Sequence, residues 1–198
     1  MFKPKPRRRP DLFVSAKAGV PIPARHPALR EALVQASLDP RVRSIAHVPT
    51  AHVSSAPLEP VPIDAVVLTR DDGRFYLDVV PARQVRELDD EGLVLIALRE
   101  LELTPLVVTA EDLHREPRCG NCRLVWAHHG RLVPVGLRIS ILQILRDDGP
   151  MELVRLVELV RSDHNPTLAV MALACADLLE IDLLSEPLGP STLVRSRT

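Results

Sequence analysis

The stretch IDAVVLTRDDGRFYLDVVPARQ, residues 63–84, decides the fold that the sequence predicts. β-branched and aromatic residues flank a central DDG, a pattern typical of two antiparallel strands joined by a tight turn. A three-residue loop, Asp71–Gly73, with its glycine in the left-handed conformation would pair Arg70 with Arg74. Because the loop sets the register of a hairpin, it also decides which residues of the two strands share a face.

Each predicted strand carries one aspartate, Asp64 or Asp78, where an apolar residue is more typical. The expected register pairs Asp64 with Val80 and Val66 with Asp78, which makes the two carboxylates diagonal neighbours on one face. Two carboxylates at that separation repel each other unless a cation lies between them. Since Mg²⁺ and Mn²⁺ prefer oxygen ligands, the hairpin predicts a metal-binding pair. The structural alternative is that Asp64 begins a strand at a turn and Asp78 faces solvent.

Helical and strand patterns on both sides of the hairpin indicate an α/β core. The segment before the hairpin predicts a helix that Pro40 ends, followed by a short strand. After the hairpin, Thr109 and Asp112 have the spacing of a capping box at the start of a short helix. The expected order is helix, three strands, helix, strand and helix, over residues 26–39, 41–49, the two halves of 63–84, 89–103, 104–109 and from 110 onward.

This order resembles the PD-(D/E)XK nuclease core, and most of all the TnsA-type endonuclease subunits of transposons. The resemblance covers residues 26–195, with a core over 26–116, and rests on the helix around Glu31, DPRVRSIAHVP, IDAVVLTRDDGRFYLDVV and TPLVVTAEDL. It implies a small mixed sheet flanked by helices, followed by a small C-terminal domain. By position, Asp64 matches the first aspartate of the family and Asp78 the acidic residue of its second motif. Glu31 matches the helix glutamate that supports the metal.

The resemblance also implies a chemistry, in which a bound Mg²⁺ or Mn²⁺ activates water for DNA strand cleavage. The family places a lysine two residues after the second acid, where this chain has Val80, and no lysine follows Lys17. Arg83 and Gln84 can approach, but an arginine keeps its proton and is not a base. The leading expectation is therefore a DNA-associated accessory or regulatory protein with little or no nuclease activity. The alternative is an active endonuclease that uses Asp64 and Asp78, with Glu31 assisting.

A different site is suggested by HREPRCGNCRLVWAHHG, in the predicted connector over residues 117–135 and just before it. Its C-x-x-C and flanking histidines offer four ligands of the types that bind zinc, namely His114, Cys119, Cys122 and His128. A zinc-containing transcriptional regulator is thus a third hypothesis. Free thiols with scattered surface histidines are the plain alternative.

Composition limits the remaining classes of function. The 198 residues are 46% hydrophobic and 3% aromatic with a net charge of −1, which argues against a disordered chain and against stacking platforms for single-stranded nucleic acid. No apolar run has the length of a membrane span, and three cysteines do not suggest a disulfide scaffold, so a cytoplasmic location is expected. Residues 1–25 read as an extended basic arm. It can follow DNA phosphates through Lys3, Lys5, Arg7, Arg8 and Arg9, and a solvated tail without a partner is the alternative.

The last third of the chain, residues 136–198, predicts a winged-helix-like domain of three helices and a hairpin. The helices are expected over 136–149, from 150, and from 166, with Asn165 as the cap of the third. This third helix, PTLAVMALACADLLE, is apolar and has no basic residue, so it is a poor reader of DNA bases. The expected role of the domain is contact with a protein partner or formation of a homodimer, with direct DNA contact as the alternative.

Overall fold

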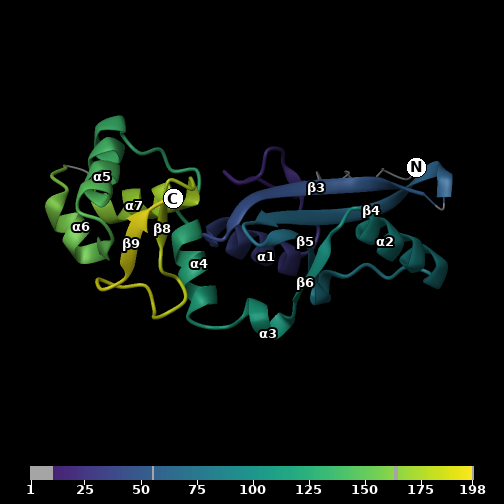
Figure 1. The fold of residues 1–198 in the computed structure, drawn as a ribbon. Helices are drawn as coiled ribbons and strands as arrows, with labels where there is room; N and C mark the ends of the chain where they lie inside the picture. The colour runs from purple at the N-terminus through teal and green to yellow at the C-terminus, as the bar shows by residue number, and fades with distance from the viewer. Residues whose placement is uncertain (1–10, 55, 163–164, 198) are drawn as a thin grey trace, which may run out of the picture.

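The computed structural model describes residues 11–54, 56–162 and 165–197, which form two lobes joined side by side (Figure 1). The protein is an α/β protein with a mixed four-stranded sheet and, in these ranges, seven α-helices. The basic residues that were expected to follow DNA phosphates, Lys3, Lys5, Arg7, Arg8 and Arg9, lie outside the described residues. In the part of the chain that is described, no helix is long and apolar enough to cross a membrane.

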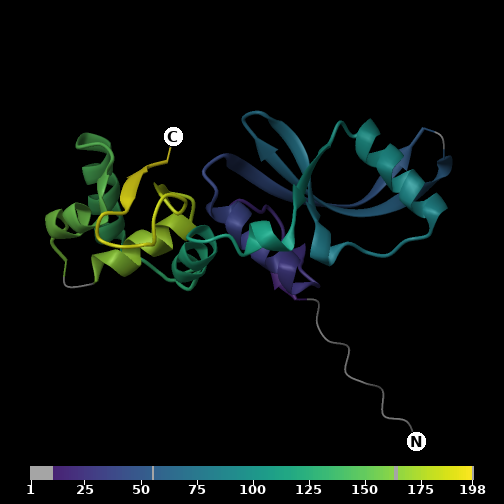
Figure 2. The same ribbon diagram turned by 90° about the horizontal axis from the view of Figure 1, so that it is seen from below.

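The larger lobe is built on the predicted sheet. Its strands β3 to β6 lie in sequence order, with β3, β4 and β5 antiparallel and β6 parallel to β5. Helix α1 packs on one face, and helix α2, which connects β5 to β6, packs on the other (Figure 2). The order of elements is therefore the expected one, with these bounds: α1 Pro27–Leu38, β3 Val42–Val53, β4 Ala56–Arg70, β5 Gly73–Val79, α2 Leu88–Glu100 and β6 Thr104–Val108.

The hairpin of β4 and β5 is present, but its predicted loop length was wrong. Arg70 pairs with Gly73, not with Arg74, so only Asp71 and Asp72 form the loop. Gly73 has a φ of 142°, which favours glycine. The change of one residue moves the register of the whole hairpin by one.

The segment before α1 is folded from residue 11 onward, which corrects the expectation of an extended arm up to residue 25. Two short strands, β1 (Leu12–Phe13) and β2 (Ile22–Pro23), pair with each other, and the side chains of Phe13 and Ile22 are buried in the core. Between them, Ala18 forms a parallel bridge to Ile45 of β3. These large apolar side chains decide the outcome, since burying each is worth roughly 1.5–3 kcal/mol.

The stretch expected to be a connector, residues 117–135, contains a nine-residue helix. After β6, a four-residue helix α3 (Ala110–Leu113) begins at the predicted capping box of Thr109 and Asp112. Helix α4 (Arg118–Trp126) then packs against both α1 and the smaller lobe, with Val125 fully buried. The cysteine motif thus belongs to a core helix, because its apolar face fills the space between the lobes.

The smaller lobe contains the three predicted helices, and its predicted hairpin is part of a three-stranded sheet. The second helix was expected from Pro150, but Met151 and Glu152 form a strand that pairs with β9. The cap of the third helix is confirmed, since Asn165 Oδ1 accepts a hydrogen bond from the Thr167 amide. The elements are α5 Val135–Asp147, β7 Met151–Glu152, α6 Leu153–Leu159, α7 Pro166–Cys175, β8 Leu179–Ile181 and β9 Leu193–Ser196, with sheet order β7-β9-β8.

One hydrophobic cluster extends through both lobes. It joins Phe13, Leu33 and Leu68 of the larger lobe to Ile141 and Leu156 of the smaller one. A second cluster, between the sheet and α2, belongs to the larger lobe alone. Because the lobes share the first cluster, they are held together by the hydrophobic effect and not only by a covalent link.

Helix α7 is enclosed within this structure. It packs against α1, α4, α5, α6 and β8, and none of its residues is exposed. Its apolar composition, which was read as a surface for a partner or a second copy, is therefore explained by internal packing.

Candidate functional site

A cleft of about 550 Å³ opens in the larger lobe where β4 and β5 separate. The two strands are paired only as far as Val67 and Tyr76, beyond which β4 continues against β3 and β5 against β6. Asp64 and Asp78 both line this cleft, together with apolar side chains from the sheet and α2 and the side chains of residues 83–86, of which only Val85 is apolar.

The two aspartates approach the cleft from opposite faces of the hairpin, and the prediction of a shared face was wrong. With Val67 opposite Tyr76, alternation places Asp78 on the face of Tyr76, which packs on the α2 side. Asp64 contacts His47, which lies opposite Val66 on β3, and the Val66 side chain belongs to the α1 side. The one-residue change in the hairpin loop is the cause, since a slip by one exchanges the faces.

Asp64 occupies a β-bulge, which explains an aspartate inside a strand. Val48 pairs with Ala65 and Thr50 with Pro62, so two residues of β4 stand opposite the single Pro49. Asp64 has a φ of 47°, a left-handed conformation that aspartate tolerates better than most residues other than glycine. A bulge turns the local strand and redirects a side chain, here toward the cleft where β4 and β5 separate.

The carboxylate of Asp64 is held by two side chains. His47 Nε2 lies 2.7 Å from one carboxylate oxygen, and Gln84 Nε2 donates a hydrogen bond of 3.0 Å to the other. Burial raises the pKa of Asp64, but the hydrogen bonds from His47 and Gln84 outweigh burial, and the pKa is lowered from 3.8. Asp64 is therefore ionised at neutral pH with both oxygens engaged.

The carboxylate of Asp78 is held by an arginine five residues further along the chain. Arg83 Nε donates a hydrogen bond of 2.8 Å to one oxygen, and a terminal nitrogen of the same guanidinium binds the other. Such a bidentate pair is the strongest common arrangement for a carboxylate. The Arg83 side chain is nevertheless 56% exposed, so it stands between Asp78 and solvent. A guanidinium thus occupies the position in which a metal ion would meet this carboxylate.

Glu31, the third expected site residue, is not among the residues that line the cleft. Its carboxylate accepts hydrogen bonds of 3.0 and 2.7 Å from Arg123 of α4, and the Cys119 thiol donates to the same oxygen at 3.2 Å. Glu31 therefore joins α1 to α4 in this structure.

Lys17 binds groups outside the cleft. Its side chain is 2% exposed, its Nζ donates a hydrogen bond of 2.7 Å to the Asp39 carbonyl, and it lies 3.4 Å from an Asp177 oxygen. Burial lowers the pKa of Lys17, and the neighbouring carboxylate of Asp177 opposes that effect. The one lysine among the described residues therefore serves the contact between the lobes and not the cleft.

The expected zinc ligands do not gather around one point. Cys119 and Cys122 are buried in α4, and burial raises the pKa of Cys122 to about 11. The imidazole of His114 contacts the Ala110 carbonyl through Nδ1, at 2.7 Å. Within the described ranges, no three His, Cys, Asp or Glu side chains form a group that could hold a metal ion. The zinc hypothesis gains no support from this arrangement.

His47 is the residue of the cleft region that sequence reasoning missed. It lies on β3 opposite Val66, and its contact with Asp64 depends on the β3–β4 register and on the bulge. Neither is visible in the sequence, whereas Arg83 and Gln84 were recognisable because they follow the second strand closely.

Comparison with known proteins leaves the family open. No model of a known protein family matches this chain. No curated protein sequence matches it either.

Proposed function

We propose that this protein is a DNA-associated accessory or regulatory protein whose larger lobe has a PD-(D/E)XK-like architecture and little or no nuclease activity. The order of elements supports the architecture: a helix, three antiparallel strands, a helix and a parallel fourth strand. The smaller lobe has the element order of a winged helix, with α5, β7, α6, α7, β8 and β9 in sequence. Both architectures occur widely in proteins that act on DNA.

One observation is the main support for the proposed low nuclease activity, namely the bidentate contact of Arg83 with Asp78. Metal-assisted hydrolysis needs a carboxylate that is free to bind the ion and a group that orients the attacking water. Here Asp78 is neutralised by a guanidinium, Val80 stands where the family has a lysine, and Lys17 is buried elsewhere. The opposite faces of Asp64 and Asp78 further separate the two carboxylates.

A second candidate function is a Mg²⁺- or Mn²⁺-dependent endonuclease. It is favoured by the common cleft of Asp64 and Asp78 and by the exposure of Arg83, whose long side chain can turn away into solvent. In that case DNA or metal would displace Arg83 from Asp78, and the site would form only in the complex.

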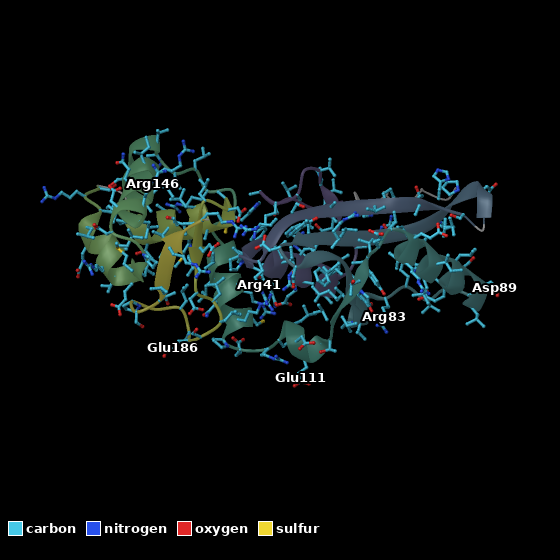
Figure 3. The ribbon with its side chains drawn as sticks, viewed as in Figure 1. Arg41, Arg83, Asp89, Glu111, Arg146 and Glu186 are labelled. Carbon is cyan, nitrogen blue, oxygen red and sulfur yellow. The ribbon has the colours of Figure 1, made fainter. Side chains whose placement is uncertain are left out.

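Two assays on the full chain distinguish these functions. We expect retardation of duplex DNA in a gel at low salt, and no cleavage of supercoiled plasmid with Mg²⁺ or Mn²⁺. Cleavage that Asp78→Ala abolishes, and that Asp89→Ala retains, would instead establish the endonuclease. Asp89 is a suitable control because it is an exposed aspartate at the start of α2 that does not line the cleft, and it lies apart from Arg83 in Figure 3. Failure to bind DNA at all would overturn the proposal.

A further inference from the structure

A second hollow, which we call the arginine groove, lies on the α1 face of the sheet at the end of β4 opposite to Asp64. Its volume is about 230 Å³, and its floor includes Leu68, Leu77 and Leu106 of three neighbouring strands. Asp64 and Arg70 are six residues apart on β4, which is about 20 Å in a strand. The groove thus lies away from the two aspartates, although Leu77 lines both hollows.

Four arginines line this groove, against two aspartates. Arg41 comes from the turn before β3, Arg70 from the end of β4, and Arg115 and Arg118 from the segment that enters α4. The carboxylates are those of Asp39 and Asp112. Arg70 also pairs with Asp72, 3.2 Å away, so the four arginines exceed their carboxylate partners by one, in a protein whose net charge is −1.

The carboxylates hold the arginine side chains in place without covering them. Asp39 accepts hydrogen bonds of 3.1 and 2.9 Å from Arg41, and Asp112 accepts one of 2.9 Å from Arg115. The side chains of Arg41 and Arg115 remain 59% and 67% exposed. A guanidinium has five N–H donors, so each keeps donors for another anion. Arginines fixed in this way lose less side-chain entropy when they bind.

The usual DNA-reading element of a winged helix is absent from the surface. In that architecture the third helix enters the major groove, but α7 is enclosed and its sequence PTLAVMALAC has no basic residue. In Figure 3, nitrogen-bearing side chains gather near Arg41, where the two lobes meet. The observations therefore favour contact with the phosphate backbone over reading of bases by α7.

We propose that the arginine groove binds the phosphate backbone of duplex DNA, with Arg41 and Arg115 as the principal contacts. This proposal rests on the proposed function and adds the surface through which DNA is held. Guanidinium groups match phosphate oxygens in geometry and charge, and such contacts carry no sequence information. Binding through this groove is accordingly independent of DNA sequence and falls steeply with salt.

The test measures duplex DNA affinity of the full chain against salt concentration, for wild type, Arg41→Gln/Arg115→Gln and Arg138→Gln/Arg146→Gln. The control pair removes equal charge from exposed positions on α5, and Arg146 lies far from Arg41 in Figure 3. We expect the groove variant to bind at least about tenfold more weakly, on unrelated sequences alike, with a salt slope reduced by about two. The control is expected to keep the wild-type slope.

Three outcomes would overturn the proposal. Unchanged affinity of the groove variant, with wild type binding DNA, would overturn it and leave the proposed function standing. An equal loss in the control pair would show that only overall charge matters. No binding by wild type would overturn both proposals together. Arg115→Glu, on an exposed side chain, provides a single reversal of charge if the double variant folds poorly, and circular dichroism checks folding.

Discussion

Two of the regions in which charged side chains meet, the cleft and the contact between the lobes, differ in burial. In the cleft, Asp78 is held by one arginine, Arg83, whose side chain is more than half exposed. At the contact between the lobes, Arg197 binds the carbonyls of Pro40 and Val42 as well as Glu180 and Asp177. A charged side chain with several buried partners stabilises the fold. A charged side chain with one exposed partner can release that partner and bind a ligand instead. The comparison separates structural charges from those available to a ligand.

Arg197→Ala should have the largest effect on stability. It would leave the carbonyls of Pro40 and Val42 without this donor and would remove one of the two arginines that bind Glu180, the other being Arg195, at a total cost of about 1–3 kcal/mol. Urea unfolding followed by circular dichroism would measure the loss. A loss of less than about 1 kcal/mol in the free energy of unfolding would show that Arg197 contributes no more than an ordinary surface ion pair. The contrast between the contact of the lobes and the cleft would then be wrong.

The reactivity of the Cys122 thiol should measure how well the region between the lobes is protected from solvent. A pKa raised to about 11 from 9.0, because of burial, leaves about a hundredfold less thiolate at pH 8. Reaction with a disulfide reagent should be slower than for a free thiol by at least that factor, and should become fast in denaturant. Rapid reaction in the native protein would show that the enclosed region opens readily.

Arg83→Gln should have little effect on folding and a clear effect on ion binding. Because Arg83 is exposed, its removal should leave the urea midpoint close to that of wild type. The freed Asp78 carboxylate should bind Mn²⁺ more tightly than in wild type, as measured by calorimetry, and Asp78→Asn in the same background should remove the gain. Equal Mn²⁺ binding by wild type and Arg83→Gln would show that the guanidinium does not compete with a cation.

Asp64→Asn should have the smallest effect, visible only in acid. The folded-state pKa of Asp64 is lowered, so its contribution is present above the unfolded pKa near 4 and is lost as pH falls through the folded value. Since the side chain is partly exposed, the contribution should stay below about 1 kcal/mol. Urea midpoints at pH 7 and pH 3 should differ slightly less in the variant, and a larger difference would contradict this assignment.

The sequence predicted the elements of the larger lobe better than their register. Alternation around DDG placed both strands, and Thr109 with Asp112 marked a helix start that the structure confirms. A loop shorter by one residue, with Gly73 at its end, was enough to place the two aspartates on opposite faces. The bulge at Asp64 and its contact with His47 depend on β3, a partner that local patterns do not specify.

Long-range packing accounts for the other differences. Phe13 and Ile22 lie among prolines and charges that suggested an arm, but the core of both lobes provides their place. For α7, composition indicated a face in need of a partner, and the partner is the protein itself. Ion pairs such as Glu31 with Arg123 join residues far apart in sequence, so no local rule predicts them.

The shared hydrophobic cluster determines how the protein can meet a long ligand. Because Leu33 and Leu68 pack in the same cluster as Ile141 and Leu156, the smaller lobe is not a separate module joined by a flexible linker. A molecule that touches both lobes therefore meets contact residues at a fixed distance from one another. The lobes do not act as two binding modules joined by a flexible linker, so the effective-concentration effect of such a linker does not apply. For the same reason the chain cannot be divided between α3 and α5 into two independent halves, since either half would expose the apolar surface that the other now covers.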